Sequence, residues 1–185
     1  MRTLKAGQSV LLLLDAVDVL KRQGINYAVI GALAASVHGA VRASMDADAV
    51  LSMAVQQIKS LEAAFQSAGF NVQLNRGDIS DPIAAVLQLK DQYENRVDFL
   101  IGLRGMEPET FSRSIDIPFH GEGLKVVGRE DFIAMKVFAG SPQDLIDARR
   151  ALTAHRETLD MPLLQRLAKR YSKEASLALQ QLVQI

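Results

Sequence analysis

Two aspartates have the residue type and spacing of a divalent-cation site. Asp46 and Asp48 stand at the start of an apolar run, Ala49–Leu51, that predicts a strand. Because side chains alternate along a strand, residues two apart point to the same side, and these two carboxylates lie next to each other. Carboxylates held that close repel each other unless a cation lies between them. We therefore expect Asp46 and Asp48 to hold a divalent cation such as Mg2+.

A third aspartate strengthens this hypothesis. Asp98 lies within 95–101, where Val97, Phe99 and Ile101 predict a strand with Asp98 on its other face. Three carboxylates that converge from two strands can hold two Mg2+ ions for phosphoryl-group chemistry. One ion favours ionisation of an attacking hydroxyl, and the other neutralises a triphosphate and its leaving pyrophosphate. The plainer alternative is a solvated strand edge that holds no metal.

Short elements must hold these aspartates in place. The segment 25–30 predicts a strand that ends at Gly31, and the small residues of 32–37 predict a helix packed closely on a sheet. A loop that contains Arg42 then leads to the predicted strand 47–53. This order of glycine turn, short helix, arginine loop and paired carboxylates favours a phosphate and metal site over an ordinary strand edge.

The remaining pattern divides the chain into two parts. Spacing and end signals predict helices over 10–23, with Ser9 as N-cap, over 55–68 and 129–139, from Pro142, from Asp160 to 171, and from Ser172 onward. Further strands are predicted over 70–74, 83–89 and 124–127, with a mobile loop at 75–82 and either a short helix or a strand within 111–119. We therefore expect an α/β (α+β) fold, in which a small mixed β-sheet flanked by helices (residues 1–128) precedes a helical extension (129–185) that closes a cleft.

Composition excludes several classes of protein. The chain has no cysteine, which removes disulfides and thiolate metal sites, and its three histidines lack zinc spacing. Its apolar runs are too short to span a bilayer and no signal peptide is recognisable, so we expect a cytoplasmic location and no membrane partner. A formal net charge of zero predicts no strong global attraction to nucleic acid.

Several segments together resemble a known family. The run Tyr27–Gly39, then Arg42, then Asp46-Ala-Asp48, resembles the nucleotidyltransferase superfamily of DNA polymerase β. It is most similar to the branch of AbiEii-like toxins and other small bacterial nucleotidyltransferases. Further on, Glu130–Lys136 and Asp144-Leu-Ile-Asp147 resemble the C-terminal signature of that branch. The resemblance implies a nucleotidyltransferase core over residues 1–128 and a helical subdomain over 129–185.

The resemblance also implies residue roles. Asp46, Asp48 and Asp98 would be the catalytic residues and the ligands of Mg2+ or Mn2+. The nucleotide would be bound by Gly31, Ala32, Arg42, Ser44, Lys136 and Asp147. Three positions depart from the family pattern: Ala32 replaces a second glycine or serine, Ser44 replaces a threonine, and Gln143 replaces a basic residue.

Plainer explanations exist for several of these residues. Asp144 could simply complete a capping box with Ser141. Lys136 could extend from an apolar helix face to solvent, and Asp147 could lie on a solvated face. His38 is expected to be a packing residue and not a catalytic one. A basic surface on the C-terminal helices could bind RNA or could be an ordinary solvated face; it comprises Arg149, Arg150, Arg166, Lys169, Arg170 and Lys173.

The implied reaction transfers a nucleoside monophosphate from a nucleoside triphosphate to a hydroxyl, with release of pyrophosphate. The acceptor could be a tRNA end, a protein side chain or a small molecule. The protein could also be the toxin of a toxin–antitoxin pair, with an antitoxin as partner. The alternative is a non-catalytic nucleotide- or partner-binding protein on the same scaffold. Apolar residues of the last two helices could belong to the core or to a homodimer face.

Overall fold

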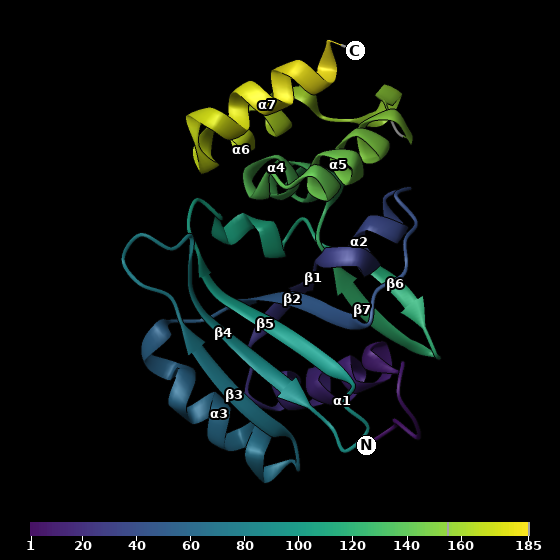
Figure 1. The fold of residues 1–185 in the computed structure, drawn as a ribbon, viewed down its shortest axis with the longest axis vertical. Coiled ribbons are helices and arrows are strands. Elements are labelled where there is room, and N and C mark those ends of the chain that lie inside the picture. The colour runs from purple at the N-terminus through teal and green to yellow at the C-terminus, as the bar shows by residue number, and fades with distance from the viewer. Residues whose placement is uncertain (155, 185) are drawn as a thin grey trace.

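A computed structural model describes residues 1–154 and 156–184 (Figure 1). Within them, a seven-stranded mixed sheet has the order β3-β4-β5-β2-β1-β7-β6. The strands are β1 (Asn26–Val29), β2 (Asp46–Ser52), β3 (Asn71–Arg76), β4 (Ile83–Lys90), β5 (Arg96–Leu103), β6 (Ile115–Phe119) and β7 (Glu122–Val126). The α-helices are α1 (Ser9–Arg22), α2 (Gly31–Val37), α3 (Ile58–Ser67), α4 (Arg129–Ala139), α5 (Pro142–Ala154), α6 (Met161–Tyr171) and α7 (Lys173–Val183). Short 3-10 turns cover Val55–Gln57, Pro108–Phe111 and Arg156–Thr158. This arrangement confirms the predicted fold class.

Strand β2 occupies the centre of the sheet. It pairs antiparallel with β1 and parallel with β5, and this parallel pairing sets Asp48 directly opposite Asp98. Consecutive strands β3, β4 and β5 form an antiparallel meander that extends the sheet to its β3 edge. The sheet therefore brings together two carboxylate-bearing strands that are separated in sequence by a helix and two other strands.

The two faces of the central strands differ in chemistry. Ala47 of β2 and Val97 and Phe99 of β5 are buried on the face that packs against α1. Phe99 also stacks on Phe65 of α3, with ring centroids 5.6 Å apart. The aspartates alternate with these residues and project from the opposite face, because successive strand side chains point to opposite sides. The buried apolar residues thus fix the two strands against the core, and the aspartates between them point away from it.

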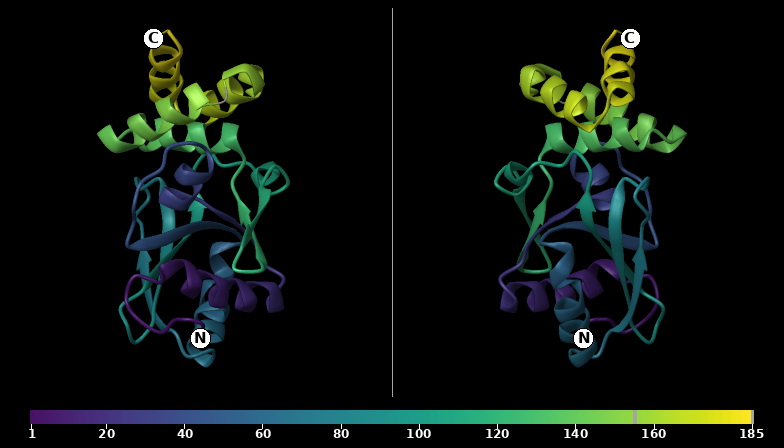
Figure 2. Two further views of the ribbon diagram at one scale, coloured as in Figure 1. Left: turned by 90° about the vertical axis from the view of Figure 1, so that its right-hand side faces the viewer. Right: turned by 90° about the vertical axis from the view of Figure 1, so that its left-hand side faces the viewer.

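The C-terminal helices form a layer at one end of the sheet. Figure 2 shows α4 to α7 stacked across this end, with α1 near the other end. The layer is built around α4, which contacts α5, α6 and α7. Its predicted end signals are confirmed, since Asp160 accepts a hydrogen bond from the Leu163 amide and Ser172 accepts one from the Ala175 amide. Among the described helices, none combines the length and apolarity needed to cross a bilayer.

The structure corrects the prediction for Ser9 and resolves the open assignment within 111–119. Ser9 is the first residue of α1 and not its N-cap, because its hydroxyl donates to the Met45 carbonyl and accepts from the Arg96 amide. The Ser9 hydroxyl makes these tertiary hydrogen bonds in place of the local capping hydrogen bond that we expected. The segment 111–119 contains the end of a 3-10 turn at Phe111 and then strand β6. In the loop at 77–82, the Arg104 guanidinium donates to the carbonyls of Ile79, Ser80 and Asp81.

Candidate active site

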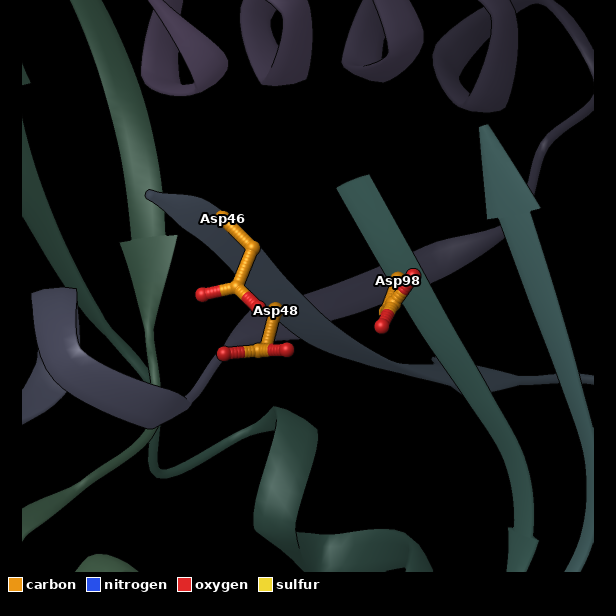
Figure 3. A group of neighbouring side chains, drawn as sticks. All are labelled: Asp46, Asp48 and Asp98. Carbon is orange, nitrogen blue, oxygen red and sulfur yellow. The ribbon is translucent and has the colours of Figure 1, made fainter. Parts of the chain in front are cut away.

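The three predicted aspartates converge on one face of the sheet. Carboxylate oxygens of Asp46, Asp48 and Asp98 lie within 4.8 Å of one another. Figure 3 shows their side chains on the side of β2 and β5 that faces away from α1. Side-chain alternation along β2 places Asp46 and Asp48 on the same face. The parallel register of β2 with β5 brings Asp98 next to them. The structure thus assembles the expected set of oxygen ligands from two strands.

The surroundings of Asp48 oppose its ionisation. Its burial, followed by the negative charges of Asp46 and Asp98, raises its pKa from 3.8 to about 6. The positive charges of Arg96 and Lys136 only partly oppose this effect. The raised pKa shows that the site favours additional positive charge, which a divalent cation would provide.

Asp98 has protein partners that the sequence analysis did not identify. The Arg96 guanidinium forms an ion pair with Asp98 Oδ2, and Arg96 Nε donates to Oδ1 at 2.9 Å. Gln88 Nε2, on the neighbouring strand, also donates to Oδ1 at 3.3 Å. The available signal for Arg96 was its position two residues before Asp98 on the same strand face. The role of Gln88 depends on the pairing of β4 with β5 and had no local signal.

Gly31 allows the start of α2 to approach the carboxylates. Its φ of +63° is left-handed, and a Cβ at this position would collide with Asp48 Oδ2. Only glycine combines this conformation with such a close approach. The next residue, Ala32, is buried and has no hydroxyl to offer. Ser44, on the other side of the site, donates its hydroxyl to Asp46 Oδ1.

A second polar cluster lies where the Arg42 loop meets α4 and α5. Lys136 Nζ is 2.7 Å from Asp144 Oδ1 and 3.3 Å from Asp147 Oδ2. Arg42 Nε is 3.2 Å from the same Oδ2, and Gln143 Nε2 donates to Asp147 Oδ1 at 2.8 Å. Asp147 is fully buried, and its carboxylate holds the Arg42 and Lys136 side chains in position. Neither Lys136 nor Asp147 lies on a solvated surface, which excludes the plainer explanations for both residues.

The expected capping role of Asp144 is also present. Asp144 accepts from the Ser141 hydroxyl and amide, while its own amide donates to Ser141 Oγ at 3.2 Å. Burial opposes ionisation of Asp144, but its hydrogen bonds with Lys136 and Ser141 leave its pKa below the ordinary value. This carboxylate therefore both caps α5 and pairs with Lys136.

His38 has the packing role that its sequence position predicts. Its ring is buried against Phe132, with centroids 5.2 Å apart, and Nε2 is 2.8 Å from the Val127 carbonyl oxygen. These contacts join α2 to the start of α4. The basic residues of the C-terminal helices are in part used structurally, since Arg166 pairs with Glu107 and Arg170 donates to the Gly105 carbonyl.

A cleft of about 570 Å³ lies beside the carboxylates, between the sheet and α4. Its polar lining comprises Gly31, Arg42, Asp48, Ser80, Arg104, Lys136 and Asp144. Its apolar lining comprises Ile30, Pro82, Ile83, Leu100, Leu103, Phe132, Met135, Phe138 and Ala139. The cleft thus combines cations and a glycine turn, which suit phosphates, with an apolar wall that could contact a planar base.

The fold is shared with several solved structures, although no protein-family model and no curated protein sequence matches the chain. An antigenic nucleotidyltransferase-like protein from Paracoccidioides brasiliensis aligns over 97% of this chain and 89% of its own, with 15% identity and a TM-score of 0.57. The antibiotic-resistance factor ANT(2'')-Ia aligns over 93% and 95%, with 12% identity and a TM-score of 0.61. The lincosamide antibiotic adenylyltransferase LnuA aligns over 82% and 99%, with 10% identity and a TM-score of 0.51. The chain therefore has the fold of these nucleotidyltransferases.

Proposed function

We propose that this protein is a metal-dependent nucleotidyltransferase that moves a nucleoside monophosphate from a nucleoside triphosphate to a hydroxyl acceptor. The observation that carries this proposal is the convergence of Asp46, Asp48 and Asp98 within 4.8 Å. The Gly31 turn and the cationic cleft beside them support it. The shared fold is consistent with this chemistry.

The carboxylates fit a hard divalent cation such as Mg2+ or Mn2+. They offer only oxygen donors, and burial, followed by the negative charges of Asp46 and Asp98, raises the pKa of Asp48. Asp46, Asp48 and Asp98 would hold the ion. When bound, it would neutralise phosphate charge and make the acceptor hydroxyl more acidic.

The protein residues have separate tasks in the proposed reaction. Arg42 and Lys136 bind the triphosphate oxygens, and the absence of a side chain at Gly31 lets its backbone approach the same oxygens. Asp98 accepts the hydrogen bond of the acceptor hydroxyl. A bond forms between the acceptor oxygen and the α-phosphorus while the bond from the α-phosphorus to the bridging oxygen breaks. Pyrophosphate leaves, and the hydroxyl proton passes through Asp98 to solvent.

Label transfer tests this function. The purified protein is incubated with Mn2+, each α-labelled triphosphate in turn, and total tRNA, protein extract or a small-molecule panel. We expect label on one acceptor class, and loss of labelling by at least about a hundredfold in Asp46→Asn, because removing a charged ligand removes several kcal/mol of stabilisation. The control is Asp116→Asn, since Asp116 lies on β6 and is not among the carboxylates that converge at the site. Equal labelling by Asp46→Asn and the unaltered protein would reject the assignment.

Two features favour the alternative of a non-catalytic binding protein. Ala32 and Gln143 depart from the family pattern, and Arg96 already forms an ion pair with Asp98. Thermal unfolding separates the two functions, because a ligand that binds only the folded state raises the melting temperature. Stabilisation by triphosphate that requires Mn2+ and Asp46 supports the transferase. Stabilisation that requires neither supports the binding protein.

The narrower predictions from sequence belong to the same proposal. They are the division into a core of residues 1–128 and a helical subdomain of 129–185, the AbiEii-like branch, and a toxin role with an antitoxin partner. A cytoplasmic location and a homodimer formed through the last helices are further proposals. A toxin role would be supported if induced expression stops growth in the unaltered protein but not in Asp46→Asn.

A further inference from the structure

Beyond β5, the positions of β4 and β3 in register with the aspartates carry a row of amide side chains. Asp48 is opposite Asp98, Asp98 is opposite Gln88, and Gln88 is opposite Gln73. Directly paired residues project from the same face of a sheet. Gln88 donates to Asp98, as described above, and Gln73 Nε2 donates to Asn75 Oδ1 at 3.1 Å. Each strand from β2 to the β3 edge therefore carries a hydrogen-bonding side chain at this register position.

This face of β3 and β4 remains accessible. The buried alternates of β4 are Ala85, Leu87 and Leu89, and they belong to the apolar core. On the aspartate-bearing face, Gln73 is exposed and Gln88 is only half-buried. Gln73 and Gln88 can therefore form hydrogen bonds with a molecule that reaches Asp98.

The charge of this face limits what can bind there. The residues of β3 and β4 on the aspartate side, all of them described by the structure, are Asn71, Gln73, Asn75, Ala84, Val86, Gln88 and Lys90. None of these is a carboxylate. Lys90 pairs with Glu94 at 2.7 Å and Arg96 pairs with Asp98, so neither cation is left without an acidic partner. A polycation would need free acidic partners, and the residues of β3 and β4 on this face offer none.

The nucleotide and this row use different sides of the cluster. Asp48 lines the cleft together with Arg42 and Lys136, whereas Asp98 is not among the cleft-lining residues. A triphosphate in the cleft would thus lie on the Asp48 side of the cluster and leave the amide row beside Asp98 to the acceptor. An attacking oxygen and a leaving pyrophosphate must stand on opposite sides of the α-phosphorus, and binding sites on two sides of the cluster would allow this.

We propose that Gln73 and Gln88 bind the acceptor, and that the acceptor is a hydroxyl-rich, sugar-like small molecule without positive charge. The proposal rests on the nucleotidyltransferase function above and specifies its substrate class. It sets this protein apart from its structural neighbour ANT(2'')-Ia, which has been solved with adenylyl-2''-tobramycin. Amide groups donate to and accept from sugar hydroxyls, and Asp98 accepts from the hydroxyl that reacts.

The test measures label transfer to three defined probes: glucose 6-phosphate, a neutral disaccharide and tobramycin. We expect transfer to at least one uncharged or anionic sugar, with kcat/KM at least about tenfold above that for tobramycin. Gln73→Leu and Gln88→Leu should each raise the acceptor KM about tenfold, because a lost polar contact costs roughly 1.4 kcal/mol. The triphosphate KM should stay within about twofold in Gln73→Leu, which does not contact the aspartates. Gln66→Leu, an exposed glutamine on α3, is the matched control.

Three results would overturn the acceptor assignment while the transferase function stands. The first is transfer to tobramycin as efficient as transfer to the sugars, and the second is an unchanged acceptor KM in both variants. The third is no label on either sugar although Mn2+ and triphosphate raise the melting temperature only when Asp46 is present. If that Asp46-dependent stabilisation is also absent, the proposed function itself fails, and the acceptor assignment fails with it.

Discussion

At the scale of single residues, the site is assembled at a cost to the fold. Asp48 is half-buried beside two other carboxylates, and Gly31 occupies a conformation that other residues rarely adopt. Both features oppose stability, and a cost of this kind is typical of functional sites. Each can be tested by a substitution that separates stability from activity.

Asp48→Asn should stabilise the metal-free protein at pH 7. Because the folded-state pKa of Asp48 is raised from 3.8 to about 6, ionisation costs stability as pH rises through that window. Asparagine removes this cost, on the order of 1–2 kcal/mol after allowance for partial solvent access. Urea unfolding should show the gain at pH 7 and little difference below about pH 4. Label transfer should be lost, and a less stable variant at pH 7 would contradict the electrostatic argument.

Gly31→Ala should destabilise the protein more than Gly7→Ala. Both glycines have a left-handed φ, +63° and +79°, but a Cβ at Gly7 meets nothing within 4 Å whereas one at Gly31 collides with Asp48. Both substitutions therefore carry the same cost of a left-handed backbone. The difference between their free energies of unfolding measures the collision with Asp48. We expect Gly31→Ala to cost roughly 1–3 kcal/mol and Gly7→Ala about 1 kcal/mol. Urea unfolding measures both, and equal costs would show that the turn can move away from Asp48.

At the scale of elements, an ion-pair cluster fixes the helical layer to the sheet. Glu107, just before the 3-10 turn at 108–111, lies 2.6 Å from Arg166 of α6 and 2.8 Å from Arg113. Arg113 Nε in turn lies 2.6 Å from Asp131 of α4, and the Thr110 hydroxyl also donates to Asp131. Three segments that are distant in sequence are joined by this buried carboxylate pair and its arginines.

Acid should weaken this cluster through Glu107. The hydrogen bond from Arg166, then that from Arg113, lowers the pKa of Glu107 from 4.5 to about 2 despite its burial. A lowered folded-state pKa contributes stability above pH 4.5 that is lost as pH falls toward 2. Glu107→Gln should therefore be less stable than the unaltered protein at pH 7, with the difference shrinking across that window. Glu109→Gln, an exposed neighbour, is the control in urea unfolding, and a difference independent of pH would contradict the prediction.

At the scale of the whole molecule, one buried carboxylate links the two parts of the chain. Asp147 of α5 is fully buried and contacts Arg42, which lies in the loop before β2, as well as Lys136 of α4. Both cations line the cleft. The helical layer therefore fixes the position of cations that belong to the candidate nucleotide site.

Asp147→Asn should impair both stability and triphosphate binding. The loss of a buried charge that holds two cations costs about 3–5 kcal/mol and leaves Arg42 and Lys136 without their shared partner. We expect a lower melting temperature and at least about a tenfold weaker stabilisation by Mn2+ and triphosphate. Asp116→Asn, on the surface of β6, should change neither quantity. A stable Asp147→Asn protein with normal triphosphate binding would show that Arg42 and Lys136 are positioned independently.

Local patterns in the sequence determined much of this architecture. Alternation placed Asp46 and Asp48 on one face, glycines marked the ends of elements, and Asp160 and Ser172 marked helix starts. These features depend on neighbours within a few residues, so periodicity and capping chemistry are sufficient to predict them.

Tertiary structure alone decided how these elements form a site. The register that sets Asp98 opposite Asp48, and Gln88 and Gln73 beyond it, comes from pairing between segments distant in sequence. The burial of Asp147 and the use of the Ser9 hydroxyl by Met45 also depend on such contacts. No local pattern encodes them, because strand register and helix docking are set by the free energy of packing the whole core.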